Sequence, residues 1–219
     1  MAPVKKFIAE KKSGNILLII IFLIALGLRT YKLGILPSSF YVEEMTNTYV
    51  GKFILLHGRD IFNHWLPLVY FDKFGDYPPV LPLYLSGVSA LNLGTTEFAG
   101  RFPMALIGAM LVFPVYALIM LMLNHRKSAY FGALIAAITP WHIVLSRTTA
   151  EGVVGLTVYT WALLWILEGI VHQNTGKIYK SYSLFFLTYF LYPGLRVITP
   201  MTLAPLPFIA TSATKHVKK

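Results

Sequence analysis

The sequence predicts an all-α membrane protein, a multispan transmembrane helical bundle of about six spans with a long outer first loop that carries interfacial helices. The composition is the first observation: of 219 residues, 56% are hydrophobic and only 13% charged, whereas soluble domains are about 45–50% apolar and about 25% charged. The second is a series of uncharged runs that approach the length of a bilayer span. The third is the gathering of basic residues between these runs, which is typical of cytoplasmic loops.

The same composition excludes several other classes of protein. The chain has no cysteine, which excludes a disulfide scaffold and a Cys-ligated zinc or iron–sulfur site. Its formal net charge of +10 is better explained by basic anchors at a membrane surface than by nucleic-acid binding, because no basic patch is interleaved with aromatic residues. The six histidines show no spacing of a metal site, and no glycine-rich nucleotide loop occurs.

Six apolar runs are long enough, or nearly so, to be predicted as spans. The first follows Lys12 and is interpreted as a retained anchor rather than a signal peptide, because no A-x-A-like cleavage site follows it. The clearest run holds 21 uncharged residues, from Pro103 to Leu123. The six predicted spans are Ser13 to Leu28, Pro103 to Leu123, Ala129 to Leu145, Gly152 to Leu167, Tyr182 to Tyr192 and Val197 to Thr211.

Charge decides whether the run from Pro78 to Leu93 crosses the membrane. If it does not cross, the basic groups at 5–12, 126–127, 177–180 and 215–219, eleven of the nineteen Lys and Arg, all face the cytoplasm. We therefore predict cytoplasmic termini, in a plasma or inner membrane, and one outer loop over about residues 32–101. Two interfacial helices are expected in that loop, near 42–57 and 78–92. Apolar residues at helical spacing and Gly58 define the first of them.

Three acidic positions in this topology are hard to explain as solvated loop charges. Glu43 and Glu44 stand at the start of the first interfacial helix, where the helix dipole favours a carboxylate. Asp76 directly precedes the rigid Tyr77-Pro78-Pro79 turn. Glu151 is expected near bilayer depth, where an unpaired carboxylate is costly. Its expected neighbour is Arg147, four residues earlier, and a structural ion pair is an equally good interpretation of these two.

Three arginines are predicted at outer span ends: Arg101, Arg147 and Arg196. A guanidinium binds phosphate oxygens in pairs through its planar fork. One isolated arginine at a span end is best interpreted as a snorkelling anchor. Three arginines beside carboxylates at one membrane face favour a site for an anionic ligand.

In order along the chain, these residues resemble the GT-C membrane glycosyltransferases, and among them the dolichyl-phosphate-mannose-protein mannosyltransferases and the aminoarabinose lipid A transferases. Each motif is weak alone, and the ordered series over about residues 15–205 is what carries the resemblance. The motifs are Phe40-Tyr41-Val42-Glu43-Glu44, Gly58-Arg59-Asp60, Phe74-Gly75-Asp76-Tyr77-Pro78-Pro79, Glu97-Phe98-Ala99-Gly100-Arg101-Phe102-Pro103, Pro140-Trp141-His142, Ser146-Arg147 with Glu151, and Tyr192-Pro193-Gly194-Leu195-Arg196.

The resemblance implies a single transmembrane GT-C module over residues 1–219, with a polyprenyl-phosphate-linked sugar donor and a protein, lipid or glycan acceptor on the outer face. It implies catalysis by Glu43 and Glu44, with Glu43 at the acidic position of the family, where Asp is usual. It implies substrate binding by Asp76, Tyr77, Arg101, Arg147, Glu151, Tyr192 and Arg196. No metal ligand is expected; a divalent metal is compatible with the carboxylates but not required.

On these residues the expected chemistry is an inverting transfer. Arg147 and Arg196 would hold the leaving lipid phosphate, and a glutamate would take the proton of the acceptor hydroxyl.

Relatives are usually longer and have more spans, so a fragment of a longer protein, a split gene product and a minimal relative all stay open. The alternative functions are a transporter, an anionic-lipid-binding subunit and an inactive truncated relative. The uncharged mid-span segments weigh against a transport path.

Overall fold

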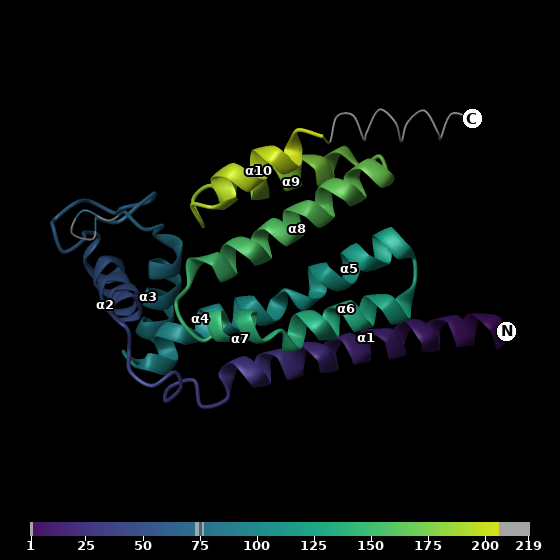
Figure 1. Cartoon of the computed structure of the whole chain (residues 1–219), viewed down its shortest axis with the longest axis horizontal. Helices are drawn as coiled ribbons and strands as arrows, with labels where there is room; N and C mark the ends of the chain where they lie inside the picture. The colour runs from purple at the N-terminus through teal and green to yellow at the C-terminus, as the bar shows by residue number, and fades with distance from the viewer. Residues whose placement is uncertain (1, 73–74, 76, 206–219) are drawn as a thin grey trace.

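The computed structural model describes residues 2–72, 75 and 77–205, with side chains from residue 16 onward, and in this part of the chain all regular structure is helical. Most of the helices run side by side along the long axis of the molecule, and α2 and α3 lie together at the end opposite the start of α1 (Figure 1). The helices are α1 (Ala2–Thr30), α2 (Val42–His57), α3 (Leu81–Leu93), α4 (Glu97–Met110), α5 (Val112–Leu123), α6 (Arg126–Ile138), α7 (Pro140–Ser146), α8 (Glu151–Val171), α9 (Thr175–Thr188) and α10 (Leu195–Leu203).

In the part of the chain that the structure describes, two helical segments are long and apolar enough to cross a bilayer, and a third qualifies if a bent pair is one span. Helices α4 and α5 form a single 27-residue segment, Glu97–Leu123, and α8 has 21 residues. The third candidate is α6 with α7, which meet at an angle of 53°. Helix α9, at 14 residues, reaches only about 21 Å. The all-helical membrane fold is therefore confirmed, and the count of six spans stays a prediction.

The predicted run from Ala129 to Leu145 is not the straight span that hydropathy indicates. Pro140 has no backbone N–H and restricts the residue before it, so the helix ends at Ile138 and a new one begins at Pro140. The two predicted runs near the C-terminus correspond to α9, which begins earlier at Thr175, and to α10. The last part of the second run lies outside the described residues.

Both helices predicted in the long first loop are confirmed as helices. Helix α2 has the predicted bounds and ends at Gly58, whose φ of 70° is the left-handed conformation that glycine adopts without strain. Helix α3 begins three residues later than expected, because Pro78 and Pro79 come before its first turn. Gly51 and Gly87 face each other where α2 and α3 cross, so the two backbones are in direct contact.

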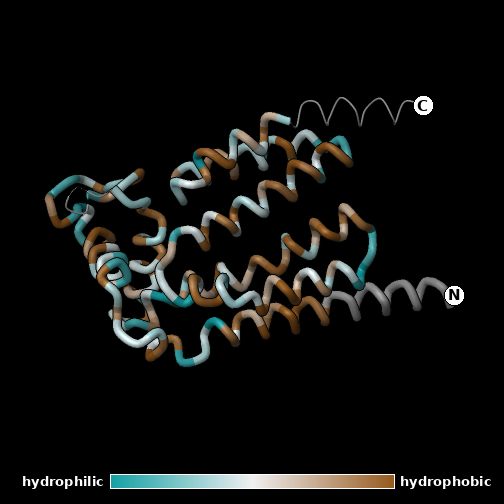
Figure 2. The backbone as a smooth tube through the Cα atoms, viewed as in Figure 1, coloured by the Kyte–Doolittle hydropathy of each residue, from teal (hydrophilic) through white to brown (hydrophobic). Residues whose placement is uncertain are grey.

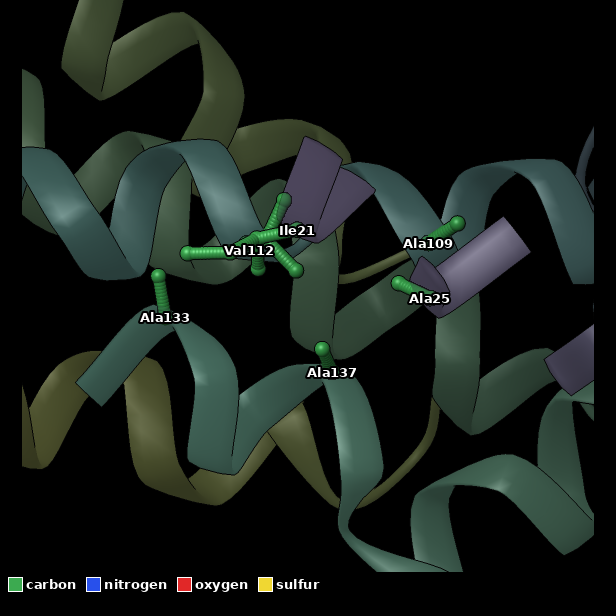
Figure 3. Close-up of a cluster of buried hydrophobic side chains, with 6 residues drawn as sticks. All are labelled: Ile21, Ala25, Ala109, Val112, Ala133 and Ala137. Atoms are coloured by element: carbon green, nitrogen blue, oxygen red, sulfur yellow. The ribbon is translucent and has the colours of Figure 1, made fainter. Parts of the chain in front are cut away.

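The apolar interior between α1, α4, α5 and α6 is made largely of small side chains. The cluster contains Ile21, Ala25, Ala109, Val112, Ala133 and Ala137 (Figure 3). Hydrophobic residues predominate along α1, α5 and α8 (Figure 2), and many of those on α1 are exposed, as expected of a helix that faces lipid. This bundle holds the starts of α2, α3 and α8 in place around the site described next.

Candidate active site

A cavity of about 380 Å³ lies where α2, α3 and α8 begin. Its walls come from three segments that are far apart in the sequence: the first turns of α2, the residues around the start of α3, and the connection between α7 and α8. The lining residues are Tyr41, Glu43, Glu44, Thr46, Asn47, Phe71, Pro78, Pro79, Pro82, Thr148, Thr149, Ala150 and Glu151.

Three of the predicted acidic residues meet at this cavity. Glu43 and Glu44 lie in the first turn of α2, and Glu151 is the first residue of α8. The N-terminus of a helix carries a partial positive charge, which stabilises a carboxylate placed there. A hydrogen bond from Asn47 Nδ2 to Thr149 Oγ1, 2.9 Å long, connects the two walls. The fold thus gathers carboxylates that the sequence separates widely, and we call this space the carboxylate cavity.

Glu44 is already engaged within the protein. The side chain is buried, at 3% exposure, and both of its carboxylate oxygens accept hydrogen bonds from Arg101. The distances are 2.9 Å from Nε and 2.8 Å from Nη2, the bidentate geometry that makes such pairs strong. The backbone N–H of Tyr41 also donates to Glu44. This carboxylate therefore has little hydrogen-bonding capacity left for a ligand.

Arg101 lies inside the protein rather than at a ligand surface. The residue has 0% exposure, and besides Glu44 its guanidinium donates to Glu97 and to carbonyl oxygens of the 33–39 segment. The ring of Phe40 lies 5.6 Å from its guanidinium carbon. These contacts fasten the segment before α2 to α4. All donor groups are in use, so a lipid phosphate would have to displace internal partners.

The expected pair of Arg147 with Glu151 is not formed. The helix breaks between the two residues, so the i, i+4 spacing does not place them on one face. The two Nη atoms of Arg147 instead donate to backbone carbonyls at and just after the end of α1, those of Leu28, Arg29, Tyr31 and Leu36. Burial, followed by the positive charge of Arg101, lowers the pKa of the Arg147 guanidinium.

Arg196 lies at a second cavity, a groove of about 670 Å³ formed mainly by α9 and α10. The residue is exposed, and its Nε donates to the carbonyl of Tyr189 at 3.1 Å. The remaining lining is almost entirely apolar or aromatic: Val69, Tyr70, Tyr182, Phe185, Phe186, Tyr189, Phe190, Thr199 and Leu203. Tyr192, at 41% exposure, packs over Gly152 and Gly155 of α8 instead of lining this groove.

The residues of the Pro-Pro motif divide between cavities. Pro78 and Pro79 line the carboxylate cavity. Tyr77 packs edge-on against Tyr70, with ring centroids 5.3 Å apart, and lines a third cavity with Asp60 and Asp72. Asp76 lies outside the described residues. Within the part of the chain that is described, no three His, Asp or Glu side chains are grouped so as to hold a metal ion.

Sequence reasoning missed three residues that matter to this region. Asn47 and Thr149 connect the walls of the cavity, and Arg29 is a fully buried arginine at the end of α1. The polar residues gave no signal above an ordinary surface. Arg29 did give one, since it is a single charge directly after the uncharged run that ends at Leu28, but that signal alone does not predict burial.

The comparison with protein families agrees with the motif series from Asp76 onward. A family model described as dolichyl-phosphate-mannose-protein mannosyltransferase matches residues 76–216, well over half of the chain. The match begins beyond Glu43 and Glu44. The comparison with curated proteins gave no match, and the comparison with solved structures gave none either. The extent of the family match shows that this chain belongs to the dolichyl-phosphate-mannose-protein mannosyltransferase family, a family of GT-C membrane glycosyltransferases.

Proposed function

We propose that the chain transfers a sugar from a polyprenyl-phosphate donor to a hydroxyl of a protein, lipid or glycan acceptor on the outer face of the membrane. The observation that carries the proposal is the cavity in which Glu43 and Glu151 meet at two helix N-termini. Family membership supports the class of reaction, and the cavity supports its place. Cysteine labelling in the membrane tests this orientation. We expect Ser128→Cys to be labelled only from the cytoplasmic side and Asn63→Cys only from the outer side.

Glu43 is the proposed general base. It lines the cavity from an exposed position, whereas the neighbouring Glu44 is buried at 3% exposure. In the reaction, the acceptor oxygen bonds to the anomeric carbon of the sugar and its proton passes to Glu43. The bond from that carbon to the phosphate oxygen breaks. Glu151, across the same cavity, orients the sugar or acceptor hydroxyls, together with Asp76, as the motif order suggests.

The groove of α9 and α10 is the proposed site of the polyprenyl chain. Its aromatic and aliphatic lining suits an isoprenoid, and Arg196 places one guanidinium beside it for the phosphate. Arg196 uses only its Nε in the hydrogen bond to Tyr189, whereas both Nη atoms of Arg147 are on backbone carbonyls. We therefore assign the leaving phosphate to Arg196 in the first place, by electrostatic stabilisation of the charge it gains.

The two proposed subsites adjoin each other across a short segment. Val69 and Tyr70 line the groove, and the next residue, Phe71, lines the carboxylate cavity. A donor whose tail lies in the groove could thus present its sugar to the cavity. Base and leaving phosphate on opposite sides of the sugar would give inversion at the anomeric carbon, by analogy with inverting glycosidases.

The proposal predicts different kinetic effects for its two named residues. The assay is sugar transfer from dolichyl-phosphate-mannose, the donor in the family description, by the full chain in proteoliposomes. Glu43→Gln is expected to lower kcat about 10²–10⁴-fold, the usual contribution of a general base, with donor binding nearly unchanged. Arg196→Lys is expected to weaken donor binding, because an ammonium cannot form the two-pronged contact with phosphate.

Glu168→Gln is the matched control for Glu43, since Glu168 pairs with Lys177 far from the cavity. The control should keep the parent rate and donor affinity. Full transfer by Glu43→Gln would exclude this residue as the base and move the assignment to Glu151 or Asp76. Parent-like donor binding by both Arg196→Lys and Arg196→Ala would reduce Arg196 to a snorkelling anchor.

A further inference from the structure

Arg29 is a buried arginine whose whole hydrogen-bonding capacity is used by neutral acceptors. Its exposure is 0%, and among the described residues no carboxylate lies within ion-pair distance of it. The five N–H groups of a guanidinium all have partners here. Nε donates to Ser146 Oγ at 3.2 Å, Nη1 to the carbonyls of Ala25 at 2.9 Å and Ala137 at 2.8 Å, and Nη2 to the carbonyl of Ala136 at 3.3 Å and to His142 Nδ1 at 2.9 Å.

Two of these acceptors are the carbonyls that the α6–α7 bend leaves without helical partners. In a continuous helix, the carbonyl of Ala136 would accept from the N–H of residue 140, but Pro140 has none. The 53° bend also interrupts the ladder in which Ala137 would accept from residue 141. The first bond of the new helix is that of the Ile143 N–H to the Thr139 carbonyl. Ala136 and Ala137 thus depend on Arg29.

The remaining contacts of Arg29 fix α7 itself. His142 Nδ1 accepts from Arg29, so a neutral ring carries its proton on Nε2. Ser146 accepts from Arg29 and donates to the carbonyl of His142. Ser146 also packs against Gly108 of α4, where an added Cβ would lie 2.6 Å from the serine Oγ. Both ends of α7 are therefore set by this guanidinium.

We propose that Arg29 is a positioning residue that replaces the two helical N–H donors lost at the α6–α7 bend and thereby holds the α7–α8 connection at the wall of the carboxylate cavity. The connection starts at Arg147, directly after Ser146, carries Thr148 and Thr149, and leads to Glu151, the first residue of α8. An unpaired backbone carbonyl at membrane depth is costly, because no water is present to replace the partner. Arginine suits the task since one planar group supplies several donors while remaining weakly hydrated.

The test is a second-site rescue that needs no enzymatic activity. The chain has no native cysteine, so maleimide labelling of Thr148→Cys in proteoliposomes reports the position of the connection. Adding Arg29→Gln is expected to speed labelling about tenfold, which corresponds to ~1.4 kcal/mol. Adding Pro140→Ala as well restores an N–H for Ala136 and should bring the rate back to within about threefold of the parent. Arg29→Lys, with one ammonium for these acceptors, should behave like Arg29→Gln.

The control is a buried hydroxyl of comparable role elsewhere. Ser181 Oγ donates to the carbonyl of Ala162 at 2.8 Å, far from the bend. Any change that Ser181→Ala causes in the labelling rate of Thr148→Cys should not be reversed by Pro140→Ala. Labelling of Arg29→Gln at the parent rate would overturn the proposal, as would labelling of the Arg29→Gln, Pro140→Ala protein as fast as Arg29→Gln alone. If Arg29→Gln fails to fold, folding of the double variant supports the proposal, and failure of both while Pro140→Ala folds overturns it.

Discussion

Helices α1, α4, α5 and α6 pack against one another through small apolar side chains, whereas α2 and α4 are joined by a buried ion pair. The first contact is the cluster around Ala25, Ala109 and Ala133, where small side chains let the helices approach closely (Figure 3). The second is the buried pair of Glu44 and Arg101, at 3% and 0% exposure. Small apolar residues tolerate little added volume, and buried charges tolerate no lost partner. The first contact thus decides how closely helices pack, and the second decides where the site residues lie.

The largest effect is expected from removing one partner of the charged contact. Arg101→Gln leaves the buried Glu44 without its counter-charge, and Glu44→Gln leaves the buried Arg101 with only the partly exposed Glu97. Either change should lower the free energy of unfolding by about 3–5 kcal/mol. Chemical unfolding in detergent measures the loss. Glu97→Gln is the matched control, because Glu97 contacts the same arginine at 3.3 Å with its side chain 34% exposed, and such a pair contributes about 0–1 kcal/mol. If Glu97→Gln and Glu44→Gln lower the free energy of unfolding equally, burial of the partner does not decide the strength of its pair with Arg101.

A smaller effect is expected at the methyl contact, and on stability alone. Ala133→Leu adds volume where the residue is fully buried, which should cost about 1–3 kcal/mol of unfolding free energy. Ile135→Leu, on the same helix at 48% exposure, should cost almost nothing. The turnover number per folded molecule should not change in either variant. A fall in kcat for Ala133→Leu would show that the apolar cluster also positions the site.

The smallest effect is expected at the hydrogen bond across the cavity. Asn47→Ala removes the donor to Thr149 and should lower the free energy of unfolding by about 0.5–1.5 kcal/mol. Asn92→Ala, which removes a bond to the carbonyl of Val88 within α3, serves as the control. Sugar transfer should fall in Asn47→Ala and stay constant in Asn92→Ala. Sugar transfer at the parent rate by both variants would mean that this hydrogen bond does not position residues needed for transfer.

Local signals made much of the fold predictable. The spacing of Met45, Tyr49, Phe53 and Leu56, followed by Gly58, gave the bounds of α2 correctly, because amphipathic period and capping act within one helix. The bend at Pro140 was not predicted. Hydropathy averaged over a window reports the length of an apolar run but carries no information about a missing N–H within it.

The candidate site was less predictable because its contacts join distant positions. The family resemblance assigns Glu43, Glu44 and Glu151 to one site, but their spacing in the sequence does not bring Glu151 to the other two, and only the fold does so. Arg101 was expected beside a ligand on the basis of its place at a span end. The sequence gives no sign that Arg101 pairs with Glu44, since the two residues are 57 positions apart. Spacing also suggested an Arg147–Glu151 pair, which fails because the helix is interrupted between them.

The glycine crossing of α2 and α3 has a consequence for how the cavity can open. Gly51 and Gly87 bring the two backbones into contact, so an added methyl group on either would fall on the main chain of the other helix. Such a crossing has no side chains that could change rotamer and let the helices slide. Helices α2 and α3 therefore move as one body that carries Glu43 and Pro82 together. If the proposed acceptor enters this cavity, we expect the cavity to open between that body and the start of α8, where the Asn47–Thr149 hydrogen bond joins the two sides.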